Sequence, residues 1–368
     1  MNVVFRVDAS VQIGTGHVMR CLTLADELRH QGHQCRFISR DHQGHLGGFI
    51  TRKGFALDLL SIPDVPDVPD VDCRDGGETA HAHWLGVNWQ IDAEQTLAAL
   101  ESIEVYWLVV DHYALDARWE KRLAVVVKRI LVIDDLADRS HECDLLLDQN
   151  LGRQEADYDQ RVPAHCIRLI GPRYALLRPE FTKRREASLQ RLVKPKLKRI
   201  LISLGGVDAN NTSGKVLSAL SDSTLPIITE LDIIMGATSP HLEEVRKQAA
   251  QLPFQATVNV NVNDMAERMC RADISIGAAG STSWERCCLG LPSIMVILAE
   301  NQRAIGNALE QNGCAHLIVE NRIADDLGPL LSSLMKSGAE LEKLANNAMR
   351  VCDGEGCSRL VSEMTRDD

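Results

Sequence analysis

Apolar runs of strand length alternate with amphipathic stretches along the first part of this chain. Residues 3–8 (VVFRVD), 105–111 and 129–135 are such runs, and the last two end in aspartate. Near-continuous apolar runs are typical of strands that are buried on both faces of a parallel sheet. The stretch after the first run carries apolar residues at helical spacing, and Gly32 ends the predicted helix. The pattern predicts an open, doubly wound α/β domain.

The same alternation continues to residue 171 and starts again at residue 199. A basic stretch with several prolines separates the two parts. We therefore predict an N-terminal Rossmann-like domain over 1–178, a linker over 179–198 and a C-terminal Rossmann-like domain over 199–368, whose last helices are able to pack back on the first domain. Further strands are expected at 34–39, 143–150, 166–171, 199–206, 231–236, 256–261, 272–280 and 292–298, with helices near 210–221 and 239–251, from 281, and to the end.

Residues 61–77 (SIPDVPDVPDVDCRDGG) break the alternation. Their prolines and acidic residues exclude a central strand or a helix, so we expect a surface loop. The repeated PDV triplets are of low complexity and carry no evident chemistry.

Composition narrows the class of protein. Aromatic residues make up 4% of the 368 residues and the net charge is −11, which argues against a nucleic-acid partner. No apolar stretch has the length of a membrane span, and the first residues do not form a signal peptide. The 11 cysteines include no C-x-x-C pair, so we expect reduced thiols in a cytoplasmic protein without a structural zinc site.

The turn after the first strand is the first candidate for chemistry. Gly14 and Gly16 precede His17, and the third glycine of a dinucleotide-binding fingerprint is replaced by Met19. A helix N-terminus disfavours a protonated histidine, so His17 would stay neutral and able to accept a proton. The alternative is a histidine that caps or packs against the helix.

A second glycine turn follows the predicted strand at 272–280. The small residue Gly280 and the hydroxyls of Ser281 and Thr282 suit a diphosphate at the start of a helix. Glu285 lies one turn further on the same side, where its carboxylate can accept hydrogen bonds from a ribose diol. The alternative is an ordinary capping box of Thr282 and Glu285.

Two other strand ends carry amides or a glycine turn. Asn301 and Gln302 follow the strand at 292–298 and suit sugar hydroxyls, although asparagine is also a favoured N-cap residue. The glycine turn within 203–215 either contacts phosphate or is a tight connection, and its spacing is not that of a Walker A loop.

Carboxylates end two strands of the first domain. Asp111 is followed by His112 and Tyr113, and Asp134 by Asp135. Two carboxylates could bind a metal ion, but no further ligand lies at a suitable spacing. Helix capping and turn formation are therefore the favoured roles, and no metal is expected.

Together these stretches resemble the nucleotide-sugar hydrolase family of the pseudaminic acid pathway, the UDP-2,4-diacetamido-2,4,6-trideoxy-β-L-altropyranose hydrolases. The resemblance runs in order from about residue 3 to about residue 310, through both domains. It rests on RVDASVQIGTGHVMRCLTLADEL, VVDHYALDARWE, DDLADR with CDLLLDQN, GPRYALLRPEF, ISLGGVDANN, and GAAGSTSWERCCLGLPSIMV with ENQ.

The resemblance implies a GT-B fold, in which two Rossmann-like domains face a central cleft. It implies hydrolysis of a UDP-sugar at the anomeric carbon with inversion and without a metal or other cofactor. By resemblance, His17 would be the base. Gly280, Ser281, Thr282 and Glu285 would contact UDP. Tyr113, Asn301 and Arg178, which lies at the domain boundary, would be further substrate contacts. Gly14 and Gly16 would then let the sugar approach the turn.

Two alternatives remain. One is a UDP-sugar-dependent glycosyltransferase of the same fold. Such an enzyme needs a surface for its acceptor, often an amphipathic patch near the membrane, and the sequence of the first domain contains no basic amphipathic helix of that kind. The other is a non-catalytic protein that binds a nucleotide sugar, in which His17 would be dispensable.

Overall fold

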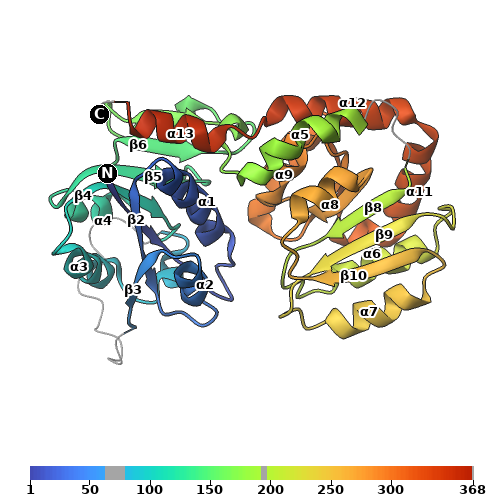
Figure 1. Ribbon diagram of the computed structural model, residues 1–368, viewed down its shortest axis with the longest axis horizontal. Helices are drawn as coiled ribbons and strands as arrows, with labels where there is room; N and C mark the ends of the chain where they lie inside the picture. Colours follow the sequence, from blue (N-terminus) through green and yellow to red (C-terminus); the bar gives the residue numbers. More distant parts are fainter. Residues whose placement is uncertain (63–78, 192–196, 367–368) are drawn as a thin grey trace. The chain divides into compact units, whose positions relative to one another are not determined.

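The chain forms two compact units in a computed structural model that describes residues 1–62, 79–191 and 197–366 (Figure 1). One unit comprises Met1–Leu176 and Gly356–Asp368, and the other comprises Leu177–Glu355. Most of the acidic loop expected at 61–77 lies outside the described residues.

The first unit is built on a seven-stranded parallel sheet in the order β3-β2-β1-β4-β5-β6-β7. Alternate residues of its central strands supply two separate apolar clusters. Phe5 and Trp107 lie in one cluster, and Val4 and Leu108 lie in the other. This is the arrangement that near-continuous apolar runs predict. The strands are β1 (Asn2–Val7), β2 (Gln34–Arg40), β3 (Ala56–Leu60), β4 (Val105–Asp111), β5 (Val127–Ile133), β6 (Leu145–Asp148) and β7 (Ile167–Ile170).

Helices from both ends of the chain cover this sheet. The last helix, α13 (Gly356–Met364), packs against α1 (Gly16–His30) and contributes Leu360 and Val361 to the same core as Phe5 (Figure 1). The other helices of the unit are α2 (Gly47–Arg52), α3 (Trp89–Leu100) and α4 (Ala117–Leu123), with the 3₁₀ helices η1 (Ala82–Leu85), η2 (Glu155–Tyr158) and η3 (Pro172–Tyr174).

The second unit contains a six-stranded parallel sheet in the order β10-β9-β8-β11-β12-β13. We expected only helices after β12, and β13 is a correction to that expectation. Its five residues follow Gly313 and extend the edge of the sheet, and so short a run gives a weak pattern. The strands are β8 (Arg199–Ser203), β9 (Glu230–Met235), β10 (Gln255–Val260), β11 (Ile274–Ala278), β12 (Ser293–Ile297) and β13 (Ala315–Val319).

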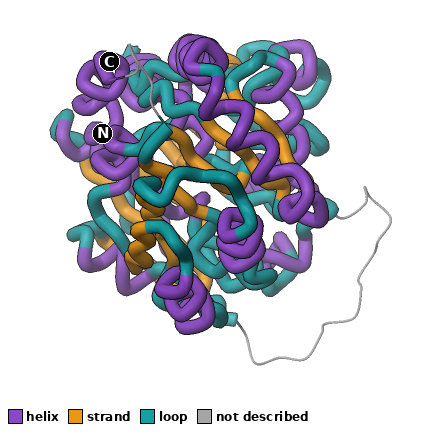
Figure 2. The backbone as a smooth tube through the Cα atoms, turned by 90° about the vertical axis from the view of Figure 1, so that its right-hand side faces the viewer, coloured by secondary structure: helices purple, strands orange, loops and turns teal. Residues whose placement is uncertain are grey.

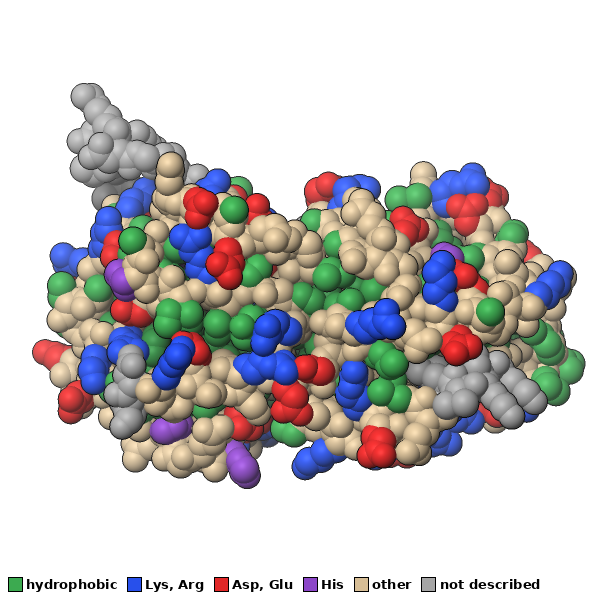
Figure 3. Space-filling model, turned by 90° about the horizontal axis from the view of Figure 1, so that it is seen from above, with side chains coloured by type: hydrophobic (Ala, Val, Ile, Leu, Met, Phe, Trp, Pro, Cys, Tyr) green, Lys and Arg blue, Asp and Glu red, His purple; other side chains and the backbone are tan. Residues whose placement is uncertain are grey.

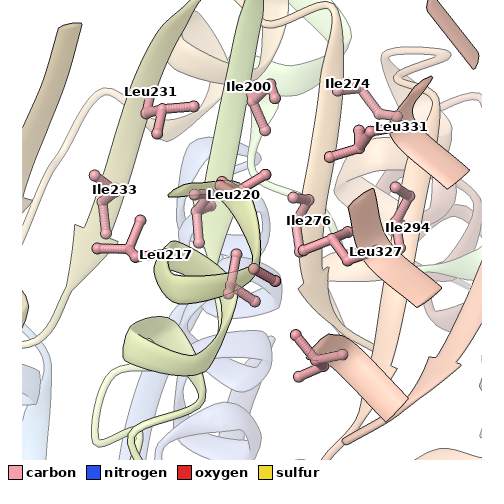
Figure 4. Close-up of a cluster of buried hydrophobic side chains, with 14 of the residues drawn as sticks. Ile200, Leu217, Leu220, Leu231, Ile233, Ile274, Ile276, Ile294, Leu327 and Leu331 are labelled. Carbon is pink, nitrogen blue, oxygen red and sulfur yellow. The ribbon is translucent and has the colours of Figure 1, made fainter. Parts of the chain in front are cut away.

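Amphipathic helices pack on both faces of this second sheet. In Figure 4, Leu217 and Leu220 of α6 and Leu327 and Leu331 of α11 point toward isoleucines of the strands. In Figure 2 the strands lie inside a layer of helices and loops. The helices are α5 (Pro179–Arg191), α6 (Thr212–Ser221), α7 (Leu242–Gln251), α8 (Met265–Arg271), α9 (Thr282–Cys288), α10 (Arg303–Gln311), α11 (Ile323–Lys336) and α12 (Gly338–Val351), with η4 (Glu300–Gln302) and η5 (Glu320–Arg322).

Much of the stretch expected as a linker, 179–198, is the helix α5. It starts at Pro179, a residue whose fixed backbone angle suits the first helical position, and it packs against α8 and α9. Prolines and basic residues suggested a connector because they are frequent in loops. Here the basic side chains lie on a helix that buries Phe181 and Ser188.

Both sheets are doubly wound, as the sequence predicted. Strand order reverses between β1 and β4 in the first unit and between β8 and β11 in the second. In open parallel sheets ligands bind outside the carboxyl ends of the strands at such a reversal. The turns that begin at Asp8 and Asp111, and at Leu204 and Ala279, lie at these positions.

Candidate active site

The turn between β1 and α1 is shaped by one serine and one glycine. The Ser10 hydroxyl accepts hydrogen bonds from the backbone N–H groups of Gln12 and Ile13 at 3.2 and 2.9 Å. Gly14 has φ +80°, which favours glycine, and its N–H donates to the carbonyl of Ser10 at 2.9 Å. The space that a side chain at Gly16 would enter is open among the described residues, so a ligand can approach the backbone there.

His17 lies in the first turn of α1 and forms a hydrogen bond with Asp111 at the carboxyl end of β4. The distance from Nδ1 to Asp111 Oδ1 is 2.6 Å, and the histidine side chain is 11% exposed. Because an ionised carboxylate can only accept, Nδ1 carries the hydrogen, and Nε2 of the neutral ring holds a lone pair. Nε2 forms no hydrogen bond within the part of the chain that the structure describes.

Arg20, one turn further along α1, holds the Asp111 carboxylate from its other side. Its Nε and Nη2 donate to the two carboxylate oxygens at 2.6 and 2.7 Å, and its Nη1 lies 2.7 Å from Asp135 Oδ2. Burial alone would raise the pKa of Asp111. The charge of Arg20 and the contact with His17 outweigh burial and hold that pKa well below its usual range. Asp111 is therefore a permanent acceptor for His17.

Tyr113 completes this group of side chains. Its hydroxyl donates to Asp135 Oδ2 at 2.7 Å, and its ring meets the edge of the His17 ring with centroids 4.6 Å apart. Burial, with the neighbouring Asp135 carboxylate, raises the pKa of Tyr113 well above its usual value. The phenol therefore remains a hydrogen-bond donor, and Tyr113 is held beside the candidate base.

The strand-end carboxylates only partly follow the roles that the sequence favoured. Asp134 accepts from the N–H of Ala137 at 2.8 Å and pairs with Arg139 at 2.8 Å, so it does form a turn. Asp111 and Asp135 instead form ion pairs with Arg20. Among the described residues, no group of three or more acidic, histidine or cysteine side chains is arranged to hold a metal ion.

A buried ionic cluster beneath this site was not anticipated. Arg6 of β1 contacts Asp8 at 2.6 Å and Asp92 of α3 at 2.5 Å, and Arg40 of β2 contacts Asp92 at 2.6 Å. All four side chains are fully buried, and the two positive charges balance the two negative ones. Charged residues within apolar strand runs, such as Arg6 in VVFRVD, are the signal that could have identified it.

In the second unit, the turn after β11 contains small polar residues that do not cap the helix that follows. Ser281 is the N-cap of α9, its side chain forms no capping hydrogen bond, and Ser281 and Thr282 are exposed. The capping box of Thr282 and Glu285 considered from the sequence is therefore absent. A side chain added at Gly280 would enter open space among the described atoms.

The structure brings Glu285 and Arg178 together. Arg178 Nη2 lies 3.8 Å from Glu285 Oε1, and Arg178 Nη1 lies 2.9 Å from Glu180 Oε1. Only 16% of the Glu285 side chain is exposed. Burial raises its pKa to about 7, although Arg178 and Arg286 act in the opposite direction. Glu285 is thus a carboxyl that changes charge near neutral pH.

The remaining predicted positions lie in the loops of the second unit. Asn301 lies in η4, and its side chain is outside the described atoms. The N-cap of α10 is Gln302, whose side-chain oxygen accepts from the N–H of Leu298 at 3.1 Å. In the glycine turn after β8, Asp208 accepts from the N–H groups of Thr212 and Ser213, so this turn is tied to α6.

Comparison with known proteins relates this geometry to a fold. Residues 199–355 match the sequence profile of the glycosyltransferase family 28 C-terminal domain. The crystal structure of Acinetobacter baumannii MurG superposes on 99% of this chain and 99% of its own, with a TM-score of 0.70 and 15% identity. The chain has the GT-B fold, as the sequence resemblance implied.

Two relatives connect the chain to sugar metabolism. The UDP-2,4-diacetamido-2,4,6-trideoxy-β-L-altropyranose hydrolase of Campylobacter jejuni is 26% identical over 85% of this chain and 97% of its own length. The spore coat polysaccharide biosynthesis protein SpsG of Bacillus subtilis is 31% identical over 52% of this chain. The chain spans a little over half the length of SpsG and of one other curated relative. The name of the first relative is that of a UDP-sugar hydrolase, and the name of the second is that of a protein of polysaccharide biosynthesis.

The surface and the helices add two observations. On the face shown in Figure 3, Lys and Arg side chains are interspersed with Asp and Glu. That face therefore carries charges of both signs and not a continuous basic patch. None of the helices within the described residues combines the length and apolar content that a membrane crossing requires.

Proposed function

We propose that this protein hydrolyses a UDP-sugar at its anomeric carbon, with His17 as the general base. The observation that carries the proposal is the pairing of His17 Nδ1 with the buried, ionised Asp111 at the strand-order reversal of the first sheet. Because Nδ1 donates to Asp111, the lone pair lies on Nε2, which forms no hydrogen bond with the described residues. A histidine held in this way is equipped to accept a proton from water.

The reaction balances without a further reactant. The oxygen of a water molecule bonds to the anomeric carbon while its proton moves to His17 Nε2. The bond from that carbon to the diphosphate oxygen breaks, and the electron pair leaves with UDP. Attack opposite the leaving group inverts the configuration. Asp111 stabilises the imidazolium that forms, and Arg20 keeps Asp111 ionised throughout.

We assign the nucleotide to the second unit. The backbone at Gly280 and the exposed hydroxyls of Ser281 and Thr282 would contact the diphosphate, and Glu285 with Arg178 would contact the ribose. The open space at Gly280, the uncommitted Ser281 side chain and the position beside the β8/β11 reversal support this assignment. The match of residues 199–355 to a glycosyltransferase domain supports it independently.

The sugar is assigned to the first unit, beside Gly14, Gly16 and Tyr113. For Asn301 of the second unit, a substrate contact rests on the sequence resemblance alone. The proposed substrate is UDP-2,4-diacetamido-2,4,6-trideoxy-β-L-altropyranose, which places the protein in pseudaminic acid biosynthesis. Similarity to the Campylobacter jejuni hydrolase over nearly its whole length supports this choice. The family 28 domain supports a second candidate, a UDP-sugar-dependent glycosyltransferase.

One assay separates the candidates. Purified protein is incubated with the UDP-sugar without an acceptor, and the products are followed by NMR. We expect release of UDP and of free sugar, the sugar with inverted configuration at its anomeric carbon. Turnover that appears only after an acceptor is added would indicate a glycosyltransferase, and binding without turnover would indicate a non-catalytic protein.

The base is tested by His17→Ala, which we expect to lower turnover about 10²- to 10⁴-fold, the usual contribution of general base catalysis. His30→Ala is the matched control, because His30 lies at the exposed end of the same helix. A near-normal rate for His17→Ala would remove His17 from this role.

A further inference from the structure

The candidate base His17 belongs to a cluster of four rings in the first unit. Tyr113 stacks on Trp84 with ring centroids 5.6 Å apart and an interplanar angle of 23°. His81 meets the edges of both rings, at 5.4 Å from Tyr113 and 4.6 Å from Trp84. Tyr113 also meets His17, with ring centroids 4.6 Å apart. Tyr113 therefore contacts the ring of the candidate base, and Trp84 and His81 extend the cluster from Tyr113.

Tyr113 is itself buried, at 7% exposure, but Trp84 differs from the aromatic residues of the core. Trp107 and Trp119 are almost completely buried, at 2% and 0% exposure, whereas Trp84 is only half-buried. Within η1, Leu85 is the residue that enters the apolar core, at 1% exposure. Leu85 anchors the segment, so Trp84 is not needed to hold it to the sheet.

His81 also carries unused polar capacity. Its Nδ1 is buried and has no hydrogen-bond partner among the described residues. Burial, with nearby positive charge from Arg139, lowers the pKa of His81, and a neutral ring offers one donor and one acceptor. A buried polar atom without a partner is costly unless a ligand or water contacts it.

Tyr113 is held at a fixed distance from His17. The Tyr113 hydroxyl donates to Asp135, and Asp135 pairs with Arg20, which in turn holds the Asp111 partner of His17. The base and Tyr113 are therefore fixed by one network, and Trp84 stacks on Tyr113.

We propose that His81, Trp84 and Tyr113 form a wall that receives the sugar and selects sugars with apolar substituents, namely N-acyl and deoxy groups. This inference rests on the proposed function. Aromatic faces attract C–H groups and methyl groups, while a fully hydroxylated hexose needs more amides and carboxylates than the wall offers. The unpartnered nitrogen of His81 would form a hydrogen bond with the acyl amide.

The test compares dissociation constants for UDP, UDP-glucose and UDP-N-acetylglucosamine by calorimetry on the full chain. The unmodified protein is expected to bind UDP-N-acetylglucosamine more tightly than UDP-glucose. Trp84→Ala is expected to reduce this preference roughly tenfold, the lower range of what an apolar group contributes in a fitted pocket. Affinity for UDP alone stays unchanged, which also shows that the variant is folded.

Two variants sharpen the test. Trp84→Phe keeps a ring and should retain most of the preference. Trp89→Ala is the matched control, because Trp89 is a half-buried tryptophan of the same unit that packs under Arg118. A preference that survives in Trp84→Ala, or that Trp89→Ala loses equally, would overturn the wall.

Release of free sugar is measured in the same samples. Hydrolysis with an unchanged preference in Trp84→Ala overturns only the wall. The opposite result is also informative. If the protein hydrolyses neither these sugars nor the diacetamido substrate, but its preference for UDP-N-acetylglucosamine depends on Trp84, the wall is supported and only the proposed hydrolase is overturned.

Discussion

Asp111 determines which nitrogen of His17 is available for chemistry, and a single atom exchange removes that control. Asp111→Asn leaves the shape intact, but the amide no longer compensates Arg20 and no longer requires a donor from His17. We expect turnover to fall about 10²- to 10⁴-fold with little change in KM. The melting temperature should fall as well, because Arg20 loses a buried partner.

The control for this variant is Asp138→Asn, a partly exposed aspartate of the same unit. Its turnover should match that of the unmodified protein. If Asp111→Asn alters KM and leaves kcat unchanged, Asp111 does not act through His17.

The raised pKa of Glu285 predicts how the free energy of unfolding depends on pH. Its pKa in the folded protein, about 7, lies above the ordinary value of 4.5, so the folded state binds the proton more tightly than the unfolded state. The free energy of unfolding should therefore fall as pH rises from about 4.5 to about 7, and the loss should be complete above 7. Glu285→Gln should remove this dependence and stabilise the protein at pH 8 by on the order of 1–3 kcal/mol.

Urea denaturation of both proteins at pH 5 and pH 8 checks this expectation, with Glu267→Gln as a control on an exposed glutamate of the same unit. Parallel pH profiles for Glu285→Gln and the unmodified protein would contradict it. The same substitution should weaken UDP binding, because an amide accepts hydrogen bonds from a ribose diol less strongly than a carboxylate does.

At this scale the sequence could mark His17 as a candidate because it follows a strand and opens a helix, and its role stays a prediction. The partner of His17 is 94 residues away, and recognising Asp111 as that partner requires the strand order β1-β4. Trp84 and His81 were missed because they follow the low-complexity stretch and lie in a single 3₁₀ turn, which leaves no periodic pattern.

At the scale of elements, α13 is the clearest case for a stability measurement. Leu360 is fully buried in the core of the first unit, and the Trp107 indole donates to the Met364 carbonyl at 3.1 Å. Leu360→Ala should lower the free energy of unfolding by about 2–5 kcal/mol because it leaves a cavity. Ser358→Ala, on the exposed side of the same helix, should change it little.

Chemical denaturation followed by tryptophan fluorescence measures both variants. Equal midpoints for Leu360→Ala and Ser358→Ala would show that α13 does not contribute to this core.

The elements themselves were predicted unevenly. Long apolar runs such as those of β4 and β5 gave correct strands, since burial on both faces dominates their composition. β13 and α5 were not predicted. One is a short edge strand, and the other is a helix whose many basic residues resemble a loop in composition.

At the scale of the whole molecule, the two units differ in how the chain builds them. The core of the second unit comes from one continuous segment, whereas the core of the first includes Leu360 and Val361 from the far end of the chain. We expect a fragment of residues 177–355 to fold by itself. A fragment of residues 1–176 should fold only when 356–368 is attached to it or added as a peptide.

Dispersion of amide signals in NMR spectra of the separate fragments checks this expectation. A well-dispersed spectrum of residues 1–176 alone would contradict it. The pattern of strands and helices predicted two α/β domains and allowed the last helices to pack back on the first. It could not single out α13, because an amphipathic helix does not reveal which sheet it covers.

The split origin of the first unit also orders events during synthesis. Residues 1–176 leave the ribosome first, yet the apolar face that Leu360, Val361 and Met364 cover stays open until α13 has emerged. The second unit therefore completes its fold before the first one does, against the usual order from the N-terminus. A nascent chain stalled after residue 355 would contain a folded second unit and an incompletely folded first unit with an exposed apolar face. This is the form that chaperones would bind.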